Sequence, residues 1–561
     1  MTEATKSAAE LLVECLAVQG ADRIFTVPGE SFLAVLDALH ARTEIETITC
    51  RQEGGAAFMA CADGAMGAAG SGRPGIAFVT RGPGATNASI GVHVAQQDSQ
   101  PMILFIGDVA RGMKDREGFQ EVDFPAFFGP ICKWAAKIDD AARIPEYIAR
   151  AYAVAISGRP GPVVLALPED MLCDPVDPAL KPRPLITRPA QAVCPDAMQA
   201  LFALVADAAS PIAIIGGAGW NAKARDHFQT FAESIGLPVA TAFRRQDAIS
   251  PKSPVYAGNL GYGPNPKLVE RVKNADLVLA VGARLGEATT DGYTFPLPDH
   301  PEQLLIHIHP DPEELNRVYL TELAMCCAVD EFAEAAALWE DHTVIPFDAG
   351  AAAHAEWEQW ATHSASENPP ALDMGACITA MRETFPADTI ICNGAGNFSG
   401  WWHRYWRYDS LPTQLAPTAG AMGYGVPAAV AAALRYPDRP VVAVAGDGDF
   451  LMNGQELATA AQYGANMLVL VVDNSAYGTI RMHQEREYPG RVSATKLANP
   501  DFALLGQAFG GWSATASTTA EFTSALAEAR SMSGLRVIHM KIDIEQLAAS
   551  GATVSGLRAK A

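Results

Sequence analysis

The sequence lacks four features that would place it in other classes of protein. It has no apolar run long enough to span a bilayer, so we expect no membrane partner. It has no block of Lys and Arg, and 41 basic against 63 acidic residues give a net charge of −22, which argues against nucleic acid as a partner. Its ten cysteines are scattered without a Cys-x-x-Cys pair, so we expect thiols in a reducing compartment, not disulfides or a zinc site. The first twenty residues, with Glu3, Glu10 and Glu14, do not look like a signal peptide, and we predict a cytoplasmic protein.

Composition divides the chain into three parts. Its 561 residues are 49% hydrophobic and carry regular Gly and Pro punctuation, which indicates folded α/β layers and not disorder. A Pro-rich crossing runs from Pro175 to Pro195, and a connector rich in His and Ala lies near Phe347 to Pro370. We therefore predict an α/β fold with three doubly wound parallel-sheet domains, at residues 1–174, 190–345 and 368–545.

Polar residues follow two predicted strands in the C-terminal part. An apolar stretch, Pro440 to Ala445, leads into a loop at Gly446-Asp447-Gly448, and Met467 to Val472 leads to Asp473-Asn474 after 24 intervening residues. Both polar segments should lie at the same edge of a parallel sheet. Carboxylate and amide oxygens suit Mg²⁺, which takes its remaining ligands from water and phosphates, so the metal would clamp a diphosphate. An ordinary strand-loop-helix with a capping Asp is the alternative interpretation of so short a motif.

This arrangement resembles the metal and diphosphate motif of the thiamine diphosphate-dependent enzymes, and the resemblance extends across nearly the whole chain. It implies that the side chains of Asp447 and Asn474 and the backbone carbonyl of Ala476 bind Mg²⁺. The family commonly has asparagine where this chain has Asp473. The three domains would then be the pyrimidine-binding, central and diphosphate-binding domains of that fold.

The resemblance also implies a glutamate that activates thiamine diphosphate through its aminopyrimidine ring, and Glu53 is the candidate. It is predicted to start a helix rich in Ala and Gly, whose small side chains would let a planar ring approach the backbone. Relatives often carry His where Gln52 stands. Without the resemblance, Glu53 would be interpreted as a first-turn residue favoured by the helix dipole.

Further positions match the family in the expected order. Thr80 to Asn87 resembles a glycine loop, and Asn397 is expected to donate to phosphate. Gly420 would offer its carbonyl to the exocyclic amine, and Met422 would wedge between the two rings, although a Met is by default core filler. The full set of cofactor-binding residues that the resemblance implies is Pro28, Gly29, Asn87, Asn397, Phe398, Gly420, Met422, Gly446, Gly448, Asp449, Asn474, Tyr477, Gly478 and Thr479.

Three more residues are candidates for the catalytic group beside Glu53. The segment with Phe119 and Gln120 resembles the acetolactate synthase branch of the family, which also includes pyruvate oxidase and benzaldehyde lyase-like enzymes. The resemblance implies that the side chains of Phe119 and Gln120 face the reacting carbon. His483 lies near a position where acetolactate synthases usually have tryptophan, and it is interpreted as an acid-base group, a pocket wall or a surface residue. The cluster Trp401 to Trp406 is either an aromatic flank of the site or an interface, and we favour the interface.

The implied activity is thiamine diphosphate- and Mg²⁺-dependent and acts on a 2-oxo acid through an ylide and an enamine. Acetolactate synthase-like carboligation or decarboxylation is the expected outcome, with a simple 2-oxo acid decarboxylase or a hydroxyketone lyase as alternatives. The family joins its glutamate and its diphosphate site across subunits, so we expect a homodimer or homotetramer with active sites between subunits.

Two other classes stay open. Gly217, Gly219 and Ala222 fit the spacing of a dinucleotide fingerprint and would suit a nucleotide-linked oxidoreductase, but no acidic residue appears about 20 positions further on. The resemblance to a family central domain leaves FAD binding open, and the acetolactate synthase pattern is altered here at Gly282 to Glu287. A non-catalytic homologue is the other alternative, although Glu53, Asp447 and Asn474 are all present.

Overall fold

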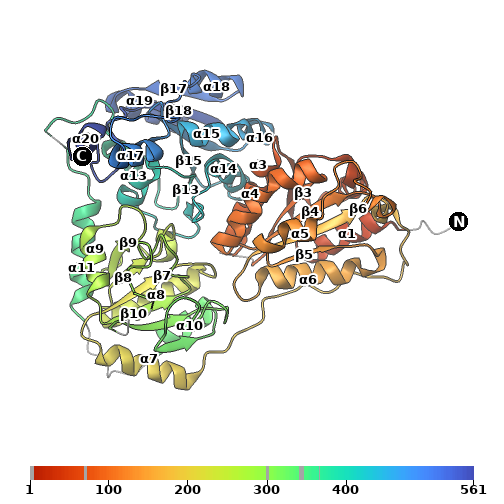
Figure 1. Ribbon diagram of the computed structural model, residues 1–561, viewed down its shortest axis with the longest axis horizontal. Helices are drawn as coiled ribbons and strands as arrows, with labels where there is room; N and C mark the ends of the chain where they lie inside the picture. The colour runs from red at the N-terminus through yellow and green to blue at the C-terminus, as the bar shows by residue number, and fades with distance from the viewer. Residues whose placement is uncertain (1–5, 69–71, 299–301, 340–346, 366, 561) are drawn as a thin grey trace. The chain divides into compact units, whose positions relative to one another are not determined.

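The computed structural model describes residues 6–68, 72–298, 302–339, 347–365 and 367–560. Within these ranges the chain forms three six-stranded parallel sheets, one after another along the sequence (Figure 1). The predicted α/β fold with three doubly wound sheets is therefore confirmed. The chain divides into two compact units. The first comprises Met1–Pro189, Val430–Arg435 and Asn453–Gly464, and the second comprises Ala190–Ala429, Tyr436–Met452 and Ala465–Ala561.

The first sheet has the strand order β2-β1-β3-β4-β6-β5, and its central strands are short and apolar. In chain order its strands are β1 (Arg23–Thr26), β2 (Glu46–Thr49), β3 (Gly75–Val79), β4 (Met102–Asp108), β5 (Trp134–Lys137) and β6 (Pro162–Pro168). Strands β3, β4 and β6 are buried along their whole length, as expected for a parallel sheet covered on both faces.

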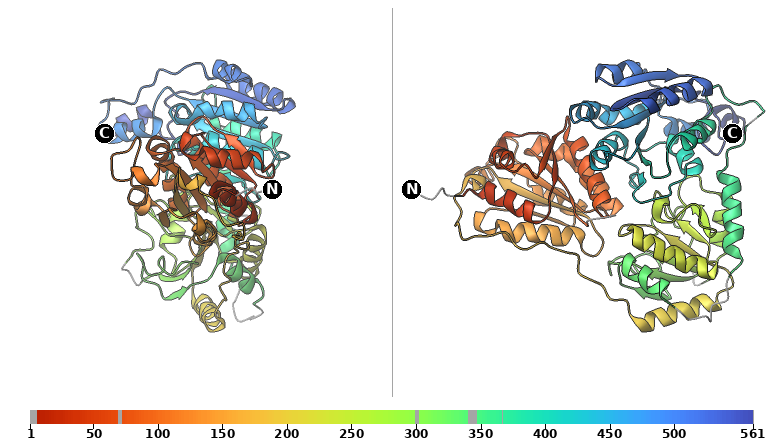
Figure 2. Two further views of the ribbon diagram at one scale, coloured as in Figure 1. Left: turned by 90° about the vertical axis from the view of Figure 1, so that its right-hand side faces the viewer. Right: turned by 180° about the vertical axis from the view of Figure 1, so that it is seen from behind.

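Helices cover both faces of the first sheet. One face packs against α1 (Ala8–Val18), α2 (Leu33–His40) and α6 (Ile144–Ile156), which share a hydrophobic core with it. The other face carries α3 (Glu53–Ala68) and α4 (Gly82–Asp98), with α5 (Phe124–Phe128) following further along the chain (Figures 1 and 2). The expectation of a glycine loop at residues 80–87 is wrong, because the chain is helical from Gly82 onward. Pro83 lies in the first turn of this helix, where its missing N–H costs no hydrogen bond.

The second sheet has the order β12-β11-β10-β7-β8-β9. Its strands are β7 (Pro211–Ile215), β8 (Val239–Thr241), β9 (Tyr256–Asn259), β10 (Leu277–Val281), β11 (Leu304–Ile308) and β12 (Leu323–Met325). Its helices are α7 (Pro195–Asp207), α8 (Ala222–Ile235), α9 (Pro266–Lys273), α10 (Val329–Ala337) and α11 (Ala349–Ala361). Gly217 has a φ of +74°, and a Cβ there would lie 1.9 Å from the carbonyl oxygen of Gly282. The backbone conformation and close approach to a neighbouring strand end thus account for this glycine without a nucleotide.

The third sheet has the order β14-β13-β15-β16-β18-β17. Its strands are β13 (Ile390–Asn393), β14 (Gln414–Leu415), β15 (Val441–Gly446), β16 (Met467–Asp473), β17 (Trp512–Ala516) and β18 (Leu535–Lys541). The helices of this region are α12 (Met374–Thr384), α13 (Phe398–Tyr405), α14 (Gly425–Arg435), α15 (Asp447–Asn453), α16 (Leu457–Gln462), α17 (Gly478–Glu487), α18 (Phe502–Ala508), α19 (Thr519–Ser531) and α20 (Val554–Lys560).

Two expectations for the third region are wrong. The loop expected after Gly446 is absent from the described chain, because α15 begins directly at Asp447. The preference for an interface at the aromatic cluster is the second wrong expectation, because Trp401, Trp402 and Trp406 are buried in the core that α13 shares with the sheet. A dense aromatic run is as suitable for a core as for an interface, and the sequence carries no signal that separates the two.

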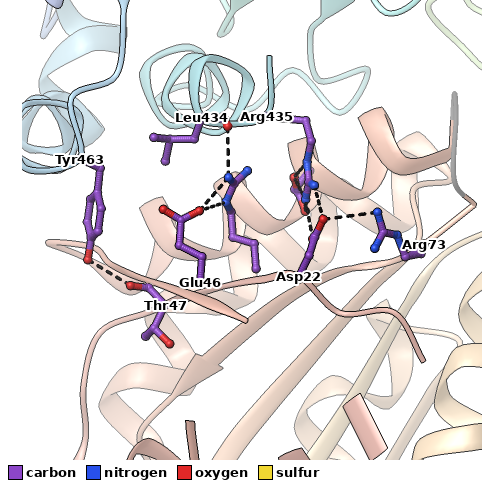
Figure 3. Close-up of polar contacts among 9 residues, drawn as sticks. Asp22, Glu46, Thr47, Arg73, Leu434, Arg435 and Tyr463 are labelled. Atoms are coloured by element: carbon purple, nitrogen blue, oxygen red, sulfur yellow. Dashed lines mark hydrogen bonds and ion pairs between the residues drawn. The ribbon is translucent and has the colours of Figure 1, made fainter. Parts of the chain in front are cut away.

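Two short segments from the C-terminal part of the sequence belong to the first unit (Figure 3). At the end of α14, Arg435 donates to both carboxylates of a pair, Asp22 and Asp63, at 2.6 to 3.0 Å. After α16, the hydroxyl of Tyr463 donates to the carbonyl of Thr47 at 3.1 Å. These contacts fix both segments against the first sheet.

Candidate cofactor-binding site

The predicted metal ligands follow two neighbouring strands. β15 pairs in parallel with β16, with Gly446 opposite Val472. Asp447 and Asp473 therefore leave the sheet at the same edge, with Asn474 directly after, as the sequence predicts. Both aspartates are almost fully buried.

The side-chain oxygens of Asp447 and Asn474 converge on one backbone N–H. The nitrogen of Ala476 lies 3.1 Å from Asp447 Oδ2 and 3.1 Å from Asn474 Oδ1, so the two oxygens are at most about twice that distance apart. Ser475, between Asn474 and Ala476 in the chain, has a φ of +54°, a left-handed conformation that is uncommon for a residue other than glycine. This turn folds the chain back, and the three predicted ligand residues lie together in the second unit.

Two residues that the sequence analysis missed complete this cluster. The side-chain amide of Asn499 donates to Asp447 Oδ2 and to Asp473 Oδ1, both at 2.8 Å. His539, buried on β18, has its Nε2 2.9 Å from Asp473 Oδ2. Both residues lie far along the chain from the motif, and only the Asn-Pro turn signal at 499–500 marks either of them in the sequence.

Burial and hydrogen bonding push the two carboxylates in opposite directions. Burial raises the pKa of Asp447, and the neighbouring Asp473 adds to the effect. Burial also acts on Asp473, but hydrogen bonds from His539, Ser475 and Asn499 outweigh it and lower its pKa. The cluster thus concentrates negative charge in a place that water reaches poorly.

The donor set fits a hard divalent cation. It combines the carboxylate of Asp447 with the side-chain amide oxygen of Asn474, and such oxygens are the ligands that Mg²⁺ prefers. The buried Oδ1 of Asn499, beside the cluster, has no hydrogen-bond partner among the described residues. In the same described part of the chain, no group of three or more His, Cys, Asp and Glu side chains is arranged to hold a metal.

Asp449, expected to bind cofactor, holds the surrounding loops together. Its Oδ1 accepts hydrogen bonds from Gly423 N at 2.7 Å and Ala395 N at 3.2 Å. A Cβ on Gly394 would lie 2.1 Å from that same oxygen, so the loop can approach this closely only as glycine. Burial raises the pKa of Asp449 to about 7. The carboxyl group therefore connects two segments that carry predicted cofactor-binding residues, one with Asn397 and the other with Gly420.

Asn397, expected to donate to phosphate, is engaged by protein groups. Its side-chain nitrogen donates to the carbonyl of Leu547 at 2.7 Å, and its oxygen accepts from the Thr479 hydroxyl at 3.0 Å. The backbone N–H of Asn397 in turn donates to Thr479 Oγ1 at 2.9 Å. Next to it, the ring of Phe398 packs so closely on Gly446 that a Cβ there would lie 2.9 Å from the ring.

The remaining predicted positions of the second unit differ in how closely they are packed. The ring of Tyr477 would come within 2.4 Å of a Cβ on Gly448, so these two predicted residues are in direct contact. Gly478 is the first residue of α17. Gly420 has a φ of +68°, and Met422, two residues on, is half-buried. His483 lies exposed on α17, and no hydrogen bond of its side chain is found within the described ranges.

Glu53 lies in the first unit, at the first turn of α3. Its Oε2 accepts a hydrogen bond from the side-chain amide of Asn87 on α4 at 2.9 Å. The two helices approach closely, because a Cβ on Gly91 of α4 would lie 2.4 Å from the Cβ of Ala57. The small residues of α3, predicted from the sequence to admit a ring, thus allow close helix packing. Glu53 and Asn87, predicted separately, are brought together.

Two loops of the first unit carry the other predicted residues. Pro28 and Gly29 lie between β1 and a short helical turn, and a Cβ on Gly29 would lie 2.5 Å from that of Thr80. Phe119 is 77% exposed on the loop before α5. Gln120 beside it has a φ of +64°, and its carbonyl accepts the Gly82 N–H at 2.9 Å. That bond connects the loop to the start of α4, the helix that carries Asn87.

Three family models match the chain in succession. They are the thiamine pyrophosphate enzyme N-terminal TPP binding domain over residues 6–127, the central domain over 198–336 and the C-terminal TPP binding domain over 394–540. Each matched region contains one of the three sheets or most of it. Within the described chain, no helix combines the length and the apolar character needed to cross a bilayer.

Curated relatives match over most of their own length. The chain is 32% identical over 532 residues to the acetolactate synthase large subunit of Parasynechococcus marenigrum, covering 90% of this chain and 82% of the relative. It is 30% identical over 541 residues to the acetolactate synthase isozyme 3 large subunit of Escherichia coli, covering 93% and 92%. The acetolactate synthase large subunit of Corynebacterium glutamicum is 30% identical over 553 residues, covering 94% and 86%.

Proposed function

The chain belongs to the thiamine pyrophosphate enzyme family, in the branch that includes the acetolactate synthase large subunits, and from this premise we propose that it performs an acetolactate synthase-like reaction. The substrate is a 2-oxo acid, which is decarboxylated and joined to a second carbonyl compound. The observation that carries the proposal is the cluster at the edge of the third sheet, where the oxygens of Asp447 and Asn474 meet at Ala476 N.

The residues of that cluster would hold Mg²⁺ and, through it, the diphosphate of thiamine diphosphate. The ligands are the side chains of Asp447 and Asn474 and the carbonyl of Ala476. When bound, the cofactor supplies a nucleophilic carbon and a cationic ring that accepts the electrons released by decarboxylation. Asn499 and Asp473 surround these ligands and set their orientation, and such supporting partners are as important to a metal site as the ligands themselves.

The loops around the cluster would hold the rest of the cofactor. We propose contacts from Gly420 and Met422 to the pyrimidine end and from Asn397 to phosphate. The remaining cofactor-binding residues of the proposal are Pro28, Gly29, Asn87, Phe398, Gly446, Gly448, Asp449, Asn474, Tyr477, Gly478 and Thr479. An amide nitrogen carries two N–H groups, so Asn397 can donate to phosphate while it donates to the carbonyl of Leu547.

Glu53 is proposed as the catalytic residue that hydrogen-bonds the pyrimidine ring and handles its proton. The hydrogen bond from Asn87 orients the Glu53 carboxylate, which supports this role. Phe119, Gln120 and His483 are proposed to face the substrates. The exposed positions of Phe119 and His483 leave both side chains accessible.

Further parts of the proposal concern organisation. We propose domains at residues 1–174, 190–345 and 368–545, a homodimer or homotetramer with active sites between subunits, and a cytoplasmic location, which is consistent with ten free cysteines. Light scattering and cell fractionation test the last two. FAD binding to the central domain stays open, and the visible absorbance of the purified protein tests it.

A substrate panel tests the activity. Purified protein with thiamine diphosphate and Mg²⁺ is incubated with pyruvate and other 2-oxo acids, alone and in pairs, while carbon dioxide is measured and products are identified by mass. We expect carbon dioxide together with a condensed hydroxy-keto acid. Carbon dioxide with an aldehyde alone would indicate a simple decarboxylase. No turnover of any acid would contradict the proposal.

A further inference from the structure

Glu456 is a buried carboxylate in the first unit that no part of the proposed chemistry uses. It ends the short helical turn at Gly454–Glu456, just before α16, and none of its surface is exposed. Its Oε1 accepts hydrogen bonds from the backbone nitrogens of Arg51 and Gln52, both at 3.0 Å. Its Oε2 accepts from Arg51 N at 3.2 Å and from the Thr459 hydroxyl at 2.5 Å. Two consecutive peptide N–H groups are thus held by one side chain more than 400 positions along the sequence.

The held peptides immediately precede Glu53. The first N–H groups of a helix have no partner within the helix and must be satisfied from elsewhere. Here the Gln52 side chain accepts from Gly55 N at 3.0 Å, and Glu456 satisfies the N–H groups of Arg51 and Gln52. Among the described contacts, the Glu53 carboxylate bonds only to Asn87. The carboxylate is therefore not drawn back onto its own helix end.

The fit around Glu456 is tight on the side of α3. A Cβ on Gly55 would lie 2.6 Å from Glu456 Oε1 and 2.9 Å from two carbons of the same side chain. A flexible surface glutamate would move aside, but this one is buried and fixed by its four hydrogen bonds. Gly55 is thus the residue that makes room for the carboxylate under the first turn of the helix.

We propose that Glu456 is a positioning residue for Glu53: it fixes the peptide that starts α3 and thereby sets where the Glu53 carboxylate points. The inference rests on the proposed function, in which Glu53 acts on the cofactor. A displacement of about 1 Å at a catalytic group can cost about 100-fold in rate, so such a clamp has a measurable effect.

Two substitutions perturb the clamp from opposite sides. Glu456→Ala removes the acceptor, and Gly55→Ala leaves every polar group in place but pushes the carboxylate away. Alanine favours the helix more than glycine does, so any loss in Gly55→Ala comes from the clash. Glu456→Gln keeps an oxygen for the two N–H groups and serves as the conservative rescue. The matched control is Gln462→Ala, which removes a contact from α16 to the Arg51 guanidinium and not to the peptide.

The first measurement needs no cofactor. Hydrogen–deuterium exchange of the cofactor-free protein should show the amides of residues 51–52 exchanging at least 10-fold faster in Glu456→Ala and Gly55→Ala. Glu456→Gln and Gln462→Ala should stay within about threefold of the wild type. Unchanged exchange in both clamp variants would overturn the clamp itself.

The second measurement separates positioning from general stability. With thiamine diphosphate, Mg²⁺ and pyruvate, we expect Glu456→Ala and Gly55→Ala to lower kcat by about 10- to 100-fold with KM nearly unchanged. In a Glu53→Gln background the same substitutions should cost less than threefold, because the residue they position is already disabled. Losses that multiply in the double variants, or full activity in both clamp variants, would overturn the inference. Full activity of Glu53→Gln, or an inactive wild type, would instead overturn the proposed function on which it rests.

Discussion

Replacing Asn499 with alanine measures how much its two hydrogen bonds to the carboxylates of the cluster stabilise the protein. The amide nitrogen of Asn499 donates to Asp447 and Asp473 at 2.8 Å each, and Asn499→Ala removes both bonds at once. A hydrogen bond to a charged group contributes about 1.5 to 3 kcal/mol, which sets an upper limit of about 3 to 6 kcal/mol for the pair. Asn499 is only half-buried, so water replaces part of the loss. We expect the metal-free protein to lose about 2 to 3 kcal/mol of stability.

The assay is thermal unfolding with and without ligand. Without metal, the loss should lower the melting temperature by about 5 to 10 °C. With saturating Mg²⁺ and thiamine diphosphate, the difference in melting temperature from the wild type should become smaller. A bound cation neutralises the negative charge of the two carboxylates, which the Asn499 amide no longer connects. The matched control is Asn466→Ala at the opposite edge of the same sheet, where Asn466 accepts from Arg536 at 2.7 Å and from Gly534 at 3.2 Å.

Three results would contradict the role given to Asn499. A melting temperature of metal-free Asn499→Ala within about 1 °C of the wild type would mean that the two hydrogen bonds contribute almost no stability, because each kcal/mol corresponds to a few degrees. Two results with ligand would also contradict this role. The first is a difference in melting temperature between Asn499→Ala and the wild type that stays equally large with ligand. The second is a decrease of the same size, on adding ligand, in the difference for Asn466→Ala. Either result would mean that the cluster does not bind the cation.

Three further predictions concern the proposed catalytic glutamate, a proposed metal ligand and a buried ion pair of the first unit. Glu53→Gln should bind cofactor within about threefold of the wild type yet lose at least about 100-fold in kcat, and equal turnover would contradict its role. Asp447→Asn should need at least 10-fold more Mg²⁺ for half-maximal activity, and an unchanged requirement would remove it from the ligand set. Arg435→Ala should cost about 3 to 5 kcal/mol, because it leaves a buried carboxylate, Asp63, without its cation. Burial already raises the pKa of Asp63, and Arg435 opposes that effect, so the variant raises it further. A group whose pKa is higher in the folded than in the unfolded state stabilises the folded protein at low pH, and this stabilisation is lost as the pH rises. In urea unfolding, the loss of unfolding free energy relative to the wild type should therefore be larger at pH 8 than at pH 5. An equal loss at both pH values would exclude this cause.

The strands and the metal edge could be predicted from the sequence because their signals are local. Short apolar runs ending in polar residues predict parallel strands, and parallel strands bring their carboxyl ends to one edge. Asp447 and Asn474 therefore meet as expected. No pattern in the sequence predicts the side-by-side helices that join Glu53 to Asn87, although the family resemblance implies a role for each of these residues.

Contacts between distant parts of the sequence could not be predicted. Asn499 and His539 lie 52 and 66 residues from their partners Asp447 and Asp473, and no spacing rule connects them. The hydrogen bond from the Asn397 side-chain amide to the Leu547 carbonyl spans 150 residues, and no pattern in the sequence predicts it. The burial of Trp402 depends on tertiary packing alone, since aromatic runs suit cores and interfaces equally.

Calorimetric titration of the metal-free protein with thiamine diphosphate measures whether Mg²⁺ at the edge of the third sheet is needed to bind the cofactor. We predict a saturable heat when Mg²⁺ is present, a heat that is weak or absent when the metal is chelated, and little heat from Asp447→Ala under either condition. Equal binding with and without Mg²⁺, by wild type and variant alike, would contradict the claim that oxygens at the edge of the third sheet hold the diphosphate through a cation.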